Sequence, residues 1–169
     1  MAADRRRFVS PALAILALLL GLAALGTVLY LQFAGDIQPC SLCIYQRVAD
    51  LAMLLAISIG FFAGRRWLWS LAALAALGGA ALAGWQWHLA NSATRKVQAC
   101  AAIQLLPQEN FSSGSFAGTL AGALAGQGSC AIAGQQRFWN LPISHWSVAV
   151  FLLCALCLLL AIFFSVRQR

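Results

Sequence analysis

The sequence predicts an all-α integral membrane protein, a bundle of four transmembrane helices. Hydrophobic residues make up 62% of the 169 residues and charged residues only 9%, whereas about 25% of the residues of a soluble domain are charged. The mean hydropathy is +0.83. The chain has four apolar runs, and each is long enough to provide the ~20 residues with which a helix crosses a bilayer. This composition excludes a soluble globular enzyme and an intrinsically disordered chain.

The first apolar run, within residues 8–35, contains one ionisable group, the phenol of Tyr30. It is too long for the core of a signal peptide and no convincing cleavage site follows it, so we expect a retained helix. The expected helices of this single domain, residues 1–169, cover about residues 11–33, 44–63, 67–90 and 146–166. Small residues such as Gly21 and the Gly78-Gly79 pair would let these helices approach one another closely.

The basic residues predict the orientation of the bundle. Eleven Lys and Arg against four Asp and Glu give a net charge of +7, and seven of the eleven lie near the two termini or at residues 65–66. The positive-inside rule then places both termini in the cytoplasm (N-in/C-in) and the loops of about residues 34–43 and 91–145 outside. We expect a lipid bilayer, and not nucleic acid, as the partner of these charges.

Cys40 and Cys43 form a C-x-x-C motif where the first outer loop meets the second helix. Such a motif can hold half of a metal site, form a passive disulfide or carry redox chemistry. Zinc is disfavoured because Cys100 and Cys130 are 30 positions apart and do not form a second close pair. Cys43 lies in the first helical turn, where free N–H groups favour a thiolate, and Arg47 follows on the same face. We therefore predict a redox-active pair and no metal site.

The remaining cysteines lie in two different settings. Cys100 and Cys130 are both in the long outer loop, where they can form either a structural disulfide or an exchangeable one, and both interpretations stay open. Cys154 and Cys157 lie inside the fourth apolar run, so we expect them to act as small apolar side chains. Apolar residues of the long loop recur at roughly helical spacing, so this loop can hold a short amphipathic helix at the membrane surface: Phe111, Phe116, Leu120 and Leu124.

The segment Pro39-Cys-Ser-Leu-Cys-Ile-Tyr-Gln-Arg47 resembles the disulfide bond formation protein B family, DsbB. The resemblance covers nearly the whole chain, with four spans, a C-x-x-C followed by Arg, and a second cysteine pair in the second outer loop. It implies a multi-pass enzyme of the bacterial inner membrane whose redox cysteines face the periplasm. Such an enzyme reoxidises a periplasmic thioredoxin-fold oxidase of the DsbA type and passes the electrons to membrane quinone, either ubiquinone or menaquinone.

The resemblance also implies a role for each cysteine. A cysteine of reduced DsbA attacks the Cys100–Cys130 disulfide and joins to Cys100. The freed Cys130 attacks Cys40 of the Cys40–Cys43 disulfide and releases Cys43 as a thiolate. Cys43 then donates to the quinone, and Arg47 supports the resulting negative charge. The quinone pocket is expected to include Cys43 and Arg47.

Three further residues are candidates for the quinone pocket: His88, Ile143 and Trp146. Some family members carry a histidine near the outer end of the third helix, and either His88 or Asn91 can fill that position here. Before the fourth helix the family tends to have Gly-Leu-x-x-Pro-x-Trp, whereas this chain has Asn140-Leu-Pro-Ile-Ser-His-Trp146, with the proline two places early. This departure weakens the assignment of Ile143 and Trp146.

Asp50 is unexpected in an apolar helix. Its spacing of three residues from Arg47 favours an ion pair within the helix, and a role in proton transfer is the alternative. Two other functions stay open. One is a paralogue of the same fold that serves another thioredoxin-like partner, and the other is a structural membrane protein whose outer cysteines form passive disulfides.

Overall fold

The computed structural model describes residues 2–34, 40–65, 67–91, 135, 137–138 and 140–166. These residues form four long helices and a hairpin of two short strands: α1 (Ala2–Ala34), α2 (Ser41–Phe62), α3 (Leu68–Asn91), β1 (Arg137–Phe138), β2 (Leu141–Pro142) and α6 (Ile143–Val166). By length and composition, all four helices can cross a membrane. The predicted fold class, a bundle of four transmembrane helices, is confirmed.

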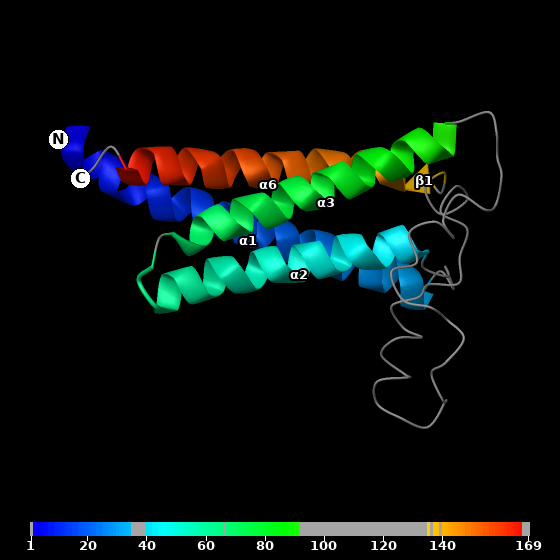
Figure 1. The fold of residues 1–169 in the computed structure, drawn as a ribbon, viewed down its shortest axis with the longest axis horizontal. Helices are drawn as coiled ribbons and strands as arrows, with labels where there is room; N and C mark the ends of the chain where they lie inside the picture. Colours follow the sequence, from blue (N-terminus) through cyan, green and yellow to red (C-terminus); the bar gives the residue numbers. More distant parts are fainter. Residues whose placement is uncertain are drawn as a thin grey trace, which may run out of the picture.

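Each helix packs against two neighbours. Helices α1 and α3 lie on opposite sides of the bundle, and both contact α2 and α6. Figure 1 shows both chain ends and the α2–α3 turn at one end of the bundle, and the start of α2 and the β1–β2 hairpin at the other. Gly64 allows the α2–α3 turn because it adopts a φ of +63°, which residues with a Cβ rarely adopt. The four spans thus bring both termini to one end, opposite Cys40 and Cys43.

Helix α1 differs most from the expected bounds, and helix α2 begins three residues before its expected start. Helix α1 begins at Ala2, so the basic N-terminal segment continues the first helix. Helix α6 begins at Ile143, three residues before the expected start. Pro142 precedes it directly and restricts Leu141 to extended backbone, so the helix starts as soon as the proline has been passed. Asn140, at the turn of the hairpin, has a φ of +63°, which asparagine tolerates better than most residues.

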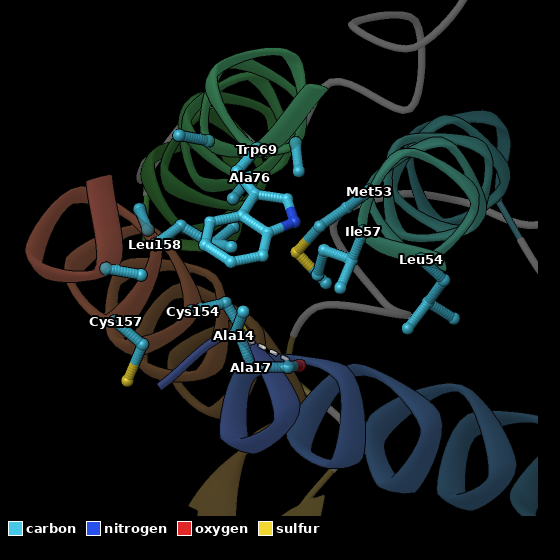
Figure 2. Packing of buried hydrophobic residues seen from close by; sticks show 14 residues of the cluster. Ala14, Ala17, Met53, Leu54, Ile57, Trp69, Ala76, Cys154, Cys157 and Leu158 are labelled. Carbon is cyan, nitrogen blue, oxygen red and sulfur yellow. Dashed lines mark hydrogen bonds between the residues drawn. The ribbon is translucent and has the colours of Figure 1, made fainter. Parts of the chain in front are cut away.

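The core of the bundle combines small residues of α1, α3 and α6 with larger side chains, which α2 contributes together with Trp69 of α3 and Leu158 of α6 (Figure 2). Trp69 of α3 is 4% exposed and projects its ring between the helices, 5.4 Å from the ring of Phe61. Cys154 and Cys157 of α6 belong to the same core, and the thiol of Cys154 donates to the carbonyl oxygen of Ala17 at 3.7 Å. Both cysteines are buried far along α6 from the hairpin, among apolar side chains.

Two glycines lie where helices approach closely. At Gly79 of α3, an added Cβ would lie 2.6 Å from Cδ1 of Phe151 on α6, and at Gly21 of α1 it would lie 2.7 Å from Cε of Met53 on α2. Gly78 has no such neighbour within 4 Å. One member of the Gly78-Gly79 pair therefore faces the core and the other faces outward, as helical geometry requires of adjacent residues.

Candidate active site

Cys40 and Cys43 are brought together by the start of helix α2. Cys40 is the N-cap residue, with extended backbone angles of φ −83° and ψ 165°. Its carbonyl oxygen accepts from the backbone N–H of Ile44 at 3.2 Å, and its Sγ accepts from the backbone N–H of Cys43 at 3.3 Å. The cysteine side chain thus takes the place of the Ser or Asp oxygen that usually caps a helix. The C-x-x-C spacing sets both sulfurs beside the free N–H groups of the first turn.

The two sulfurs form a hydrogen-bonded thiol pair. The thiol of Cys40 donates to Sγ of Cys43 at 2.9 Å, and both cysteines are free thiols. Cys40 is fully buried, whereas Cys43 is partly exposed. The pKa of Cys40 is raised above its ordinary value, first because its thiol donates to Cys43 and second because burial disfavours the charged form. The shared proton therefore stays on Cys40, and the sulfur of Cys43 accepts the hydrogen bond.

A buried amide of α3 contacts both sulfurs. Nε2 of Gln86 donates to Sγ of Cys43 at 3.4 Å and lies 3.8 Å from Sγ of Cys40. The carbonyl oxygen of the same amide accepts from Nε2 of Gln46 on α2 at 2.8 Å. Gln86 is 1% exposed and Gln46 is 7% exposed. The amides of Gln46 on α2 and Gln86 on α3 therefore form one hydrogen-bonded network with the cysteine pair.

A pocket of about 280 Å³ extends from Cys43 along the interior of the bundle. Helix α2 lines it with one face, because Cys43, Gln46, Arg47 and Asp50 are spaced by three and four residues. Gln86 of α3 also reaches it. Four polar side chains of the pocket thus stand on the same stripe of α2, within two turns of the thiol pair.

The other walls of the pocket are mainly apolar. Helix α6 lines it with a second stripe at helical spacing: Ile143, Trp146, Ser147, Val150, Phe151 and Cys154. Helix α1 adds mostly Leu, Ala and Val side chains. This α1 wall exists because α1 packs more extensively on α6 than on α2, which leaves room between α1 and α2. The pocket therefore suits a flat apolar molecule with a polar end directed toward α2.

The comparisons with known proteins agree with this site. The family model described as disulfide bond formation protein DsbB matches residues 10–161. The chain belongs to the DsbB family. It is 33% identical over 139 residues to a protein of Methylococcus capsulatus named "Disulfide bond formation protein B", which covers 77% of this chain and 80% of the relative. It is 32% identical over 159 residues to a protein of the same name from Acinetobacter baumannii, covering 88% of each. Membership of the DsbB family identifies the chain as a thiol oxidoreductase of disulfide bond formation.

The structure brings four of the residues predicted for the DsbB site to one pocket: Cys43, Arg47, Ile143 and Trp146. It places Cys40 against Cys43. His88 is exposed on α3, with its ring 5.9 Å from that of Trp85, and it is not among the lining residues found in the described part of the chain. Its role at the quinone stays a prediction, as does that of Asn91.

Other predictions for this DsbB protein are not tested by the structure. Cys100, Cys130 and the possible amphipathic helix of the long loop lie outside the described residues. The ion pair between Arg47 and Asp50 also stays a prediction, although both residues line the pocket.

Gln86 and Gln46 are site residues that the sequence interpretation missed. Because Trp85 and Trp87 on either side of Gln86 are both exposed, the local sequence indicates an interfacial segment and does not single out Gln86. Its helical phase could have identified it, because it continues the buried stripe that includes Ala76, Gly79 and Ala83. A buried amide on the core face of a membrane helix is costly, which is itself a sign of a functional residue.

Proposed function

We propose that this DsbB protein takes electrons from a reduced thioredoxin-fold thiol oxidase of the DsbA type and passes them to membrane quinone. The overall reaction removes two electrons and two protons from the partner's dithiol, which becomes a disulfide. A bound quinone supplies the acceptor for both electrons and both protons. We place the protein in the bacterial inner membrane, with the Cys40–Cys43 end of the bundle toward the periplasm.

The position of Cys43 is the observation that carries this proposal. Its sulfur is part of the thiol pair with Cys40 and also lines the pocket between α1, α2 and α6. A passive disulfide would need only the first of these positions. A cysteine that passes electrons from a protein partner to a lipid-dissolved acceptor needs both, because the two reactions must meet at one sulfur.

The residues of the pocket fit a quinone head group. Its carbonyl oxygens need a hydrogen-bond donor or a positive charge, and Arg47 supplies the charge one turn along α2 from Cys43. Its ring needs flat apolar walls, which Ile143 and Trp146 would provide on α6. The volume of about 280 Å³ is near the lower end of the ~300–1,000 Å³ of ordinary ligand pockets. It suits a single ring, with an attached lipid tail lying outside.

The ends of the bundle support the proposed orientation. Arg65 is exposed in the α2–α3 turn, at the end of the bundle where both termini lie (Figure 1). Positive charge at this end favours the cytoplasmic side, so the thiol pair at the opposite end would face the periplasm. A pair on that side can meet a secreted partner in an oxidising compartment. We assign Cys100 and Cys130 as the pair that first reacts with the partner, on the family resemblance.

The first experiment is turnover by the purified protein. Reduced DsbA-type partner should be oxidised only when quinone is supplied under anaerobic conditions. Cys43→Ser should abolish turnover because, among the described residues, Cys43 is the one thiol that both belongs to the pair and lines the pocket. Cys157→Ser is the matched control, since Cys157 is buried in the core and does not line the pocket. Normal turnover by Cys43→Ser, or turnover that does not depend on quinone, would contradict the proposal.

The second experiment tests the pocket through Arg47. Arg47→Ala should raise the KM for quinone, because a positive charge at the polar end of the pocket is lost. Arg65→Ala is the control, since it removes an exposed charge at the far end of the bundle. If Arg47→Ala has the same KM for quinone as the wild-type protein, Arg47 does not contact the acceptor.

A further inference from the structure

We infer that Gln86 is a catalytic residue that stabilises negative charge on Cys43 when the Cys40–Cys43 disulfide is cleaved, and that Gln46 is its positioning residue. This inference rests on the proposed function, because it assigns a role in the cleavage step of that reaction. It adds two amides to a site that the cysteines and Arg47 otherwise define. Its support is the buried network that joins Gln46, Gln86 and Cys43.

The orientation of the Gln86 amide is determined by Gln46. A glutamine side chain has one carbonyl oxygen, which accepts, and one NH₂ group, which donates. The oxygen of Gln86 accepts from Nε2 of Gln46 at 2.8 Å, so its NH₂ group is directed toward Cys43. If the amide were rotated by half a turn, two NH₂ groups would face each other and an oxygen would face the sulfur. Gln46 thus selects the orientation that donates to the cysteine.

The donor acts on the sulfur that gains charge. When a thiolate attacks Sγ of Cys40, a new S–S bond forms and the Cys40–Cys43 bond breaks. The electron pair of the broken bond goes to Sγ of Cys43, which leaves as a thiolate. A sulfur in a disulfide is a weak acceptor, whereas hydrogen bonds to an ionised acceptor are roughly twice as strong as neutral ones. The Gln86–Cys43 hydrogen bond therefore strengthens as the reaction proceeds, and an interaction of this kind accelerates the step.

Burial makes this donor effective. Gln86 and Gln46 are almost completely buried, so their dipoles are not screened by water and need no reorientation during the reaction. Cys43 lies in the first turn of α2, where the helix dipole favours negative charge, while Gln86 reaches its sulfur from α3. Charge on Cys43 is therefore stabilised from two helices at once. The resulting thiolate stays directed toward the pocket that Cys43 lines.

The thiolate fraction of Cys43 tests this inference without quinone. We would reduce the purified full-length protein and measure the ultraviolet absorbance of its thiolates at neutral pH, with Cys43→Ser subtracted as the blank. Gln86→Met keeps the length of the side chain and removes both N–H donors. We expect the ratio of thiolate to thiol at Cys43 to fall about tenfold, the effect of losing one hydrogen bond to a charged group. An unchanged fraction in folded Gln86→Met protein would overturn the role of Gln86.

Gln135→Leu is the matched control. Gln135 is exposed and donates to the carbonyl oxygen of Ala90 near the end of α3 at 2.7 Å, and within the described part of the chain it makes no hydrogen bond to a cysteine. Its loss should leave the thiolate fraction unchanged. An equal fall in Gln135→Leu would mean that any disturbance of the end of α3 has this effect, and it would overturn the inference.

Gln86→Met alone can fail to fold, because it leaves the amide of Gln46 buried without its acceptor. The double variant Gln46→Met/Gln86→Met removes both amides and avoids this cost. It should show the same tenfold fall in the ratio of thiolate to thiol, and an unchanged ratio in it would equally overturn the inference. Gln46→Met alone should give a smaller fall, and no further fall in the Gln86→Met background. Equal effects in both backgrounds would show that Gln46 does not act through Gln86.

The same preparations separate this inference from the proposed function. If the unchanged protein does not oxidise its partner with quinone, the proposed function fails, whatever the thiolate fractions are. If it does, and the thiolate fraction is insensitive to Gln86, only the present inference fails. When both hold, Gln86→Met should also lower turnover more than it changes the KM for quinone, because the lost hydrogen bond acts on Cys43 and not on binding of the acceptor.

Discussion

Replacing Gly79 by alanine should disturb both the α3–α6 contact and the pocket. The added Cβ would lie 2.6 Å from Cδ1 and 2.7 Å from Cζ of Phe151, far inside van der Waals contact. Phe151 is 7% exposed and its ring has packed neighbours on α3. The same residue lines the pocket. The ring can therefore make room for the methyl group only by separating the helices or by entering the pocket.

The size of the effect follows from a comparison with the adjacent glycine. Overpacking of a core costs about 1–3 kcal/mol, while replacing glycine by alanine within a helix gains up to about 1 kcal/mol. Gly78→Ala should show only the gain in helix stability, because nothing lies within 4 Å of its added Cβ. The helix-forming gain is common to both variants and cancels in the difference. We therefore expect Gly79→Ala to be less stable than Gly78→Ala by about 1–3 kcal/mol.

Reversible unfolding in mixed micelles measures this difference, with circular dichroism as the probe. The quinone KM, measured on the same variants, should rise for Gly79→Ala and stay unchanged for Gly78→Ala. Phe151→Leu in the Gly79→Ala background removes part of the ring and should recover part of the lost stability. Equal free energies of unfolding for the two alanine variants would refute the close approach of α3 and α6 at Gly79.

Three other predictions follow from the described residues. Ser10→Ala removes a buried hydrogen bond of 2.9 Å to the carbonyl oxygen of Ala161, so it should lower the free energy of unfolding by about 1 kcal/mol, and an unchanged value would contradict this. His88→Ala tests the predicted quinone role of His88, and an unchanged quinone KM would agree with its exposed position outside the pocket lining of the described residues. A raised KM would instead place it at the acceptor. Because the pKa of Cys40 is raised, this thiol should stay protonated as the pH rises through about 8.5, where an ordinary cysteine ionises. Alkylation of the reduced protein should then label Cys43 first, and equal labelling of Cys40 would contradict the assigned proton.

The fold was predictable because hydropathy records burial in lipid directly. Each apolar run became a helix, and the bounds of α2 and α3 lie within three residues of those expected. The starts of α2 and α6, each three residues before the expected position, were less predictable, because an apolar run does not say where its first helical turn begins. For α6, Pro142 supplies that information locally. By starting α6 at Ile143, it places Ile143 and Trp146 three residues apart on one helical face, and both line the pocket despite the early proline.

The part of the site that joins different helices was harder to predict. Cys43 and Arg47 could be related because both lie on α2, where spacing along the chain gives spacing on the helix face. The partner from α3 depends on how α3 is rotated against α2, which hydropathy does not specify. His88 and Gln86 are two residues apart, so they point in nearly opposite directions on a helix. The small-residue stripe through Ala76 and Ala83 records the buried face, and it includes Gln86 and leaves out His88.

Under the proposed function, one cysteine pair serves two reactions in different surroundings, and the structure offers a physical basis for this. A thiol–disulfide exchange needs an accessible end of the bundle, whereas a lipid-dissolved acceptor needs an apolar interior. Helix α2 connects the two, since its N-cap is Cys40 and its next three polar positions on the same face reach into the pocket. Cys43 is the first of this stripe and the only member that also touches Cys40 among the residues that the structure describes. Under the proposed function, an electron pair released onto Cys43 therefore appears at the wall of the pocket that Cys43 lines.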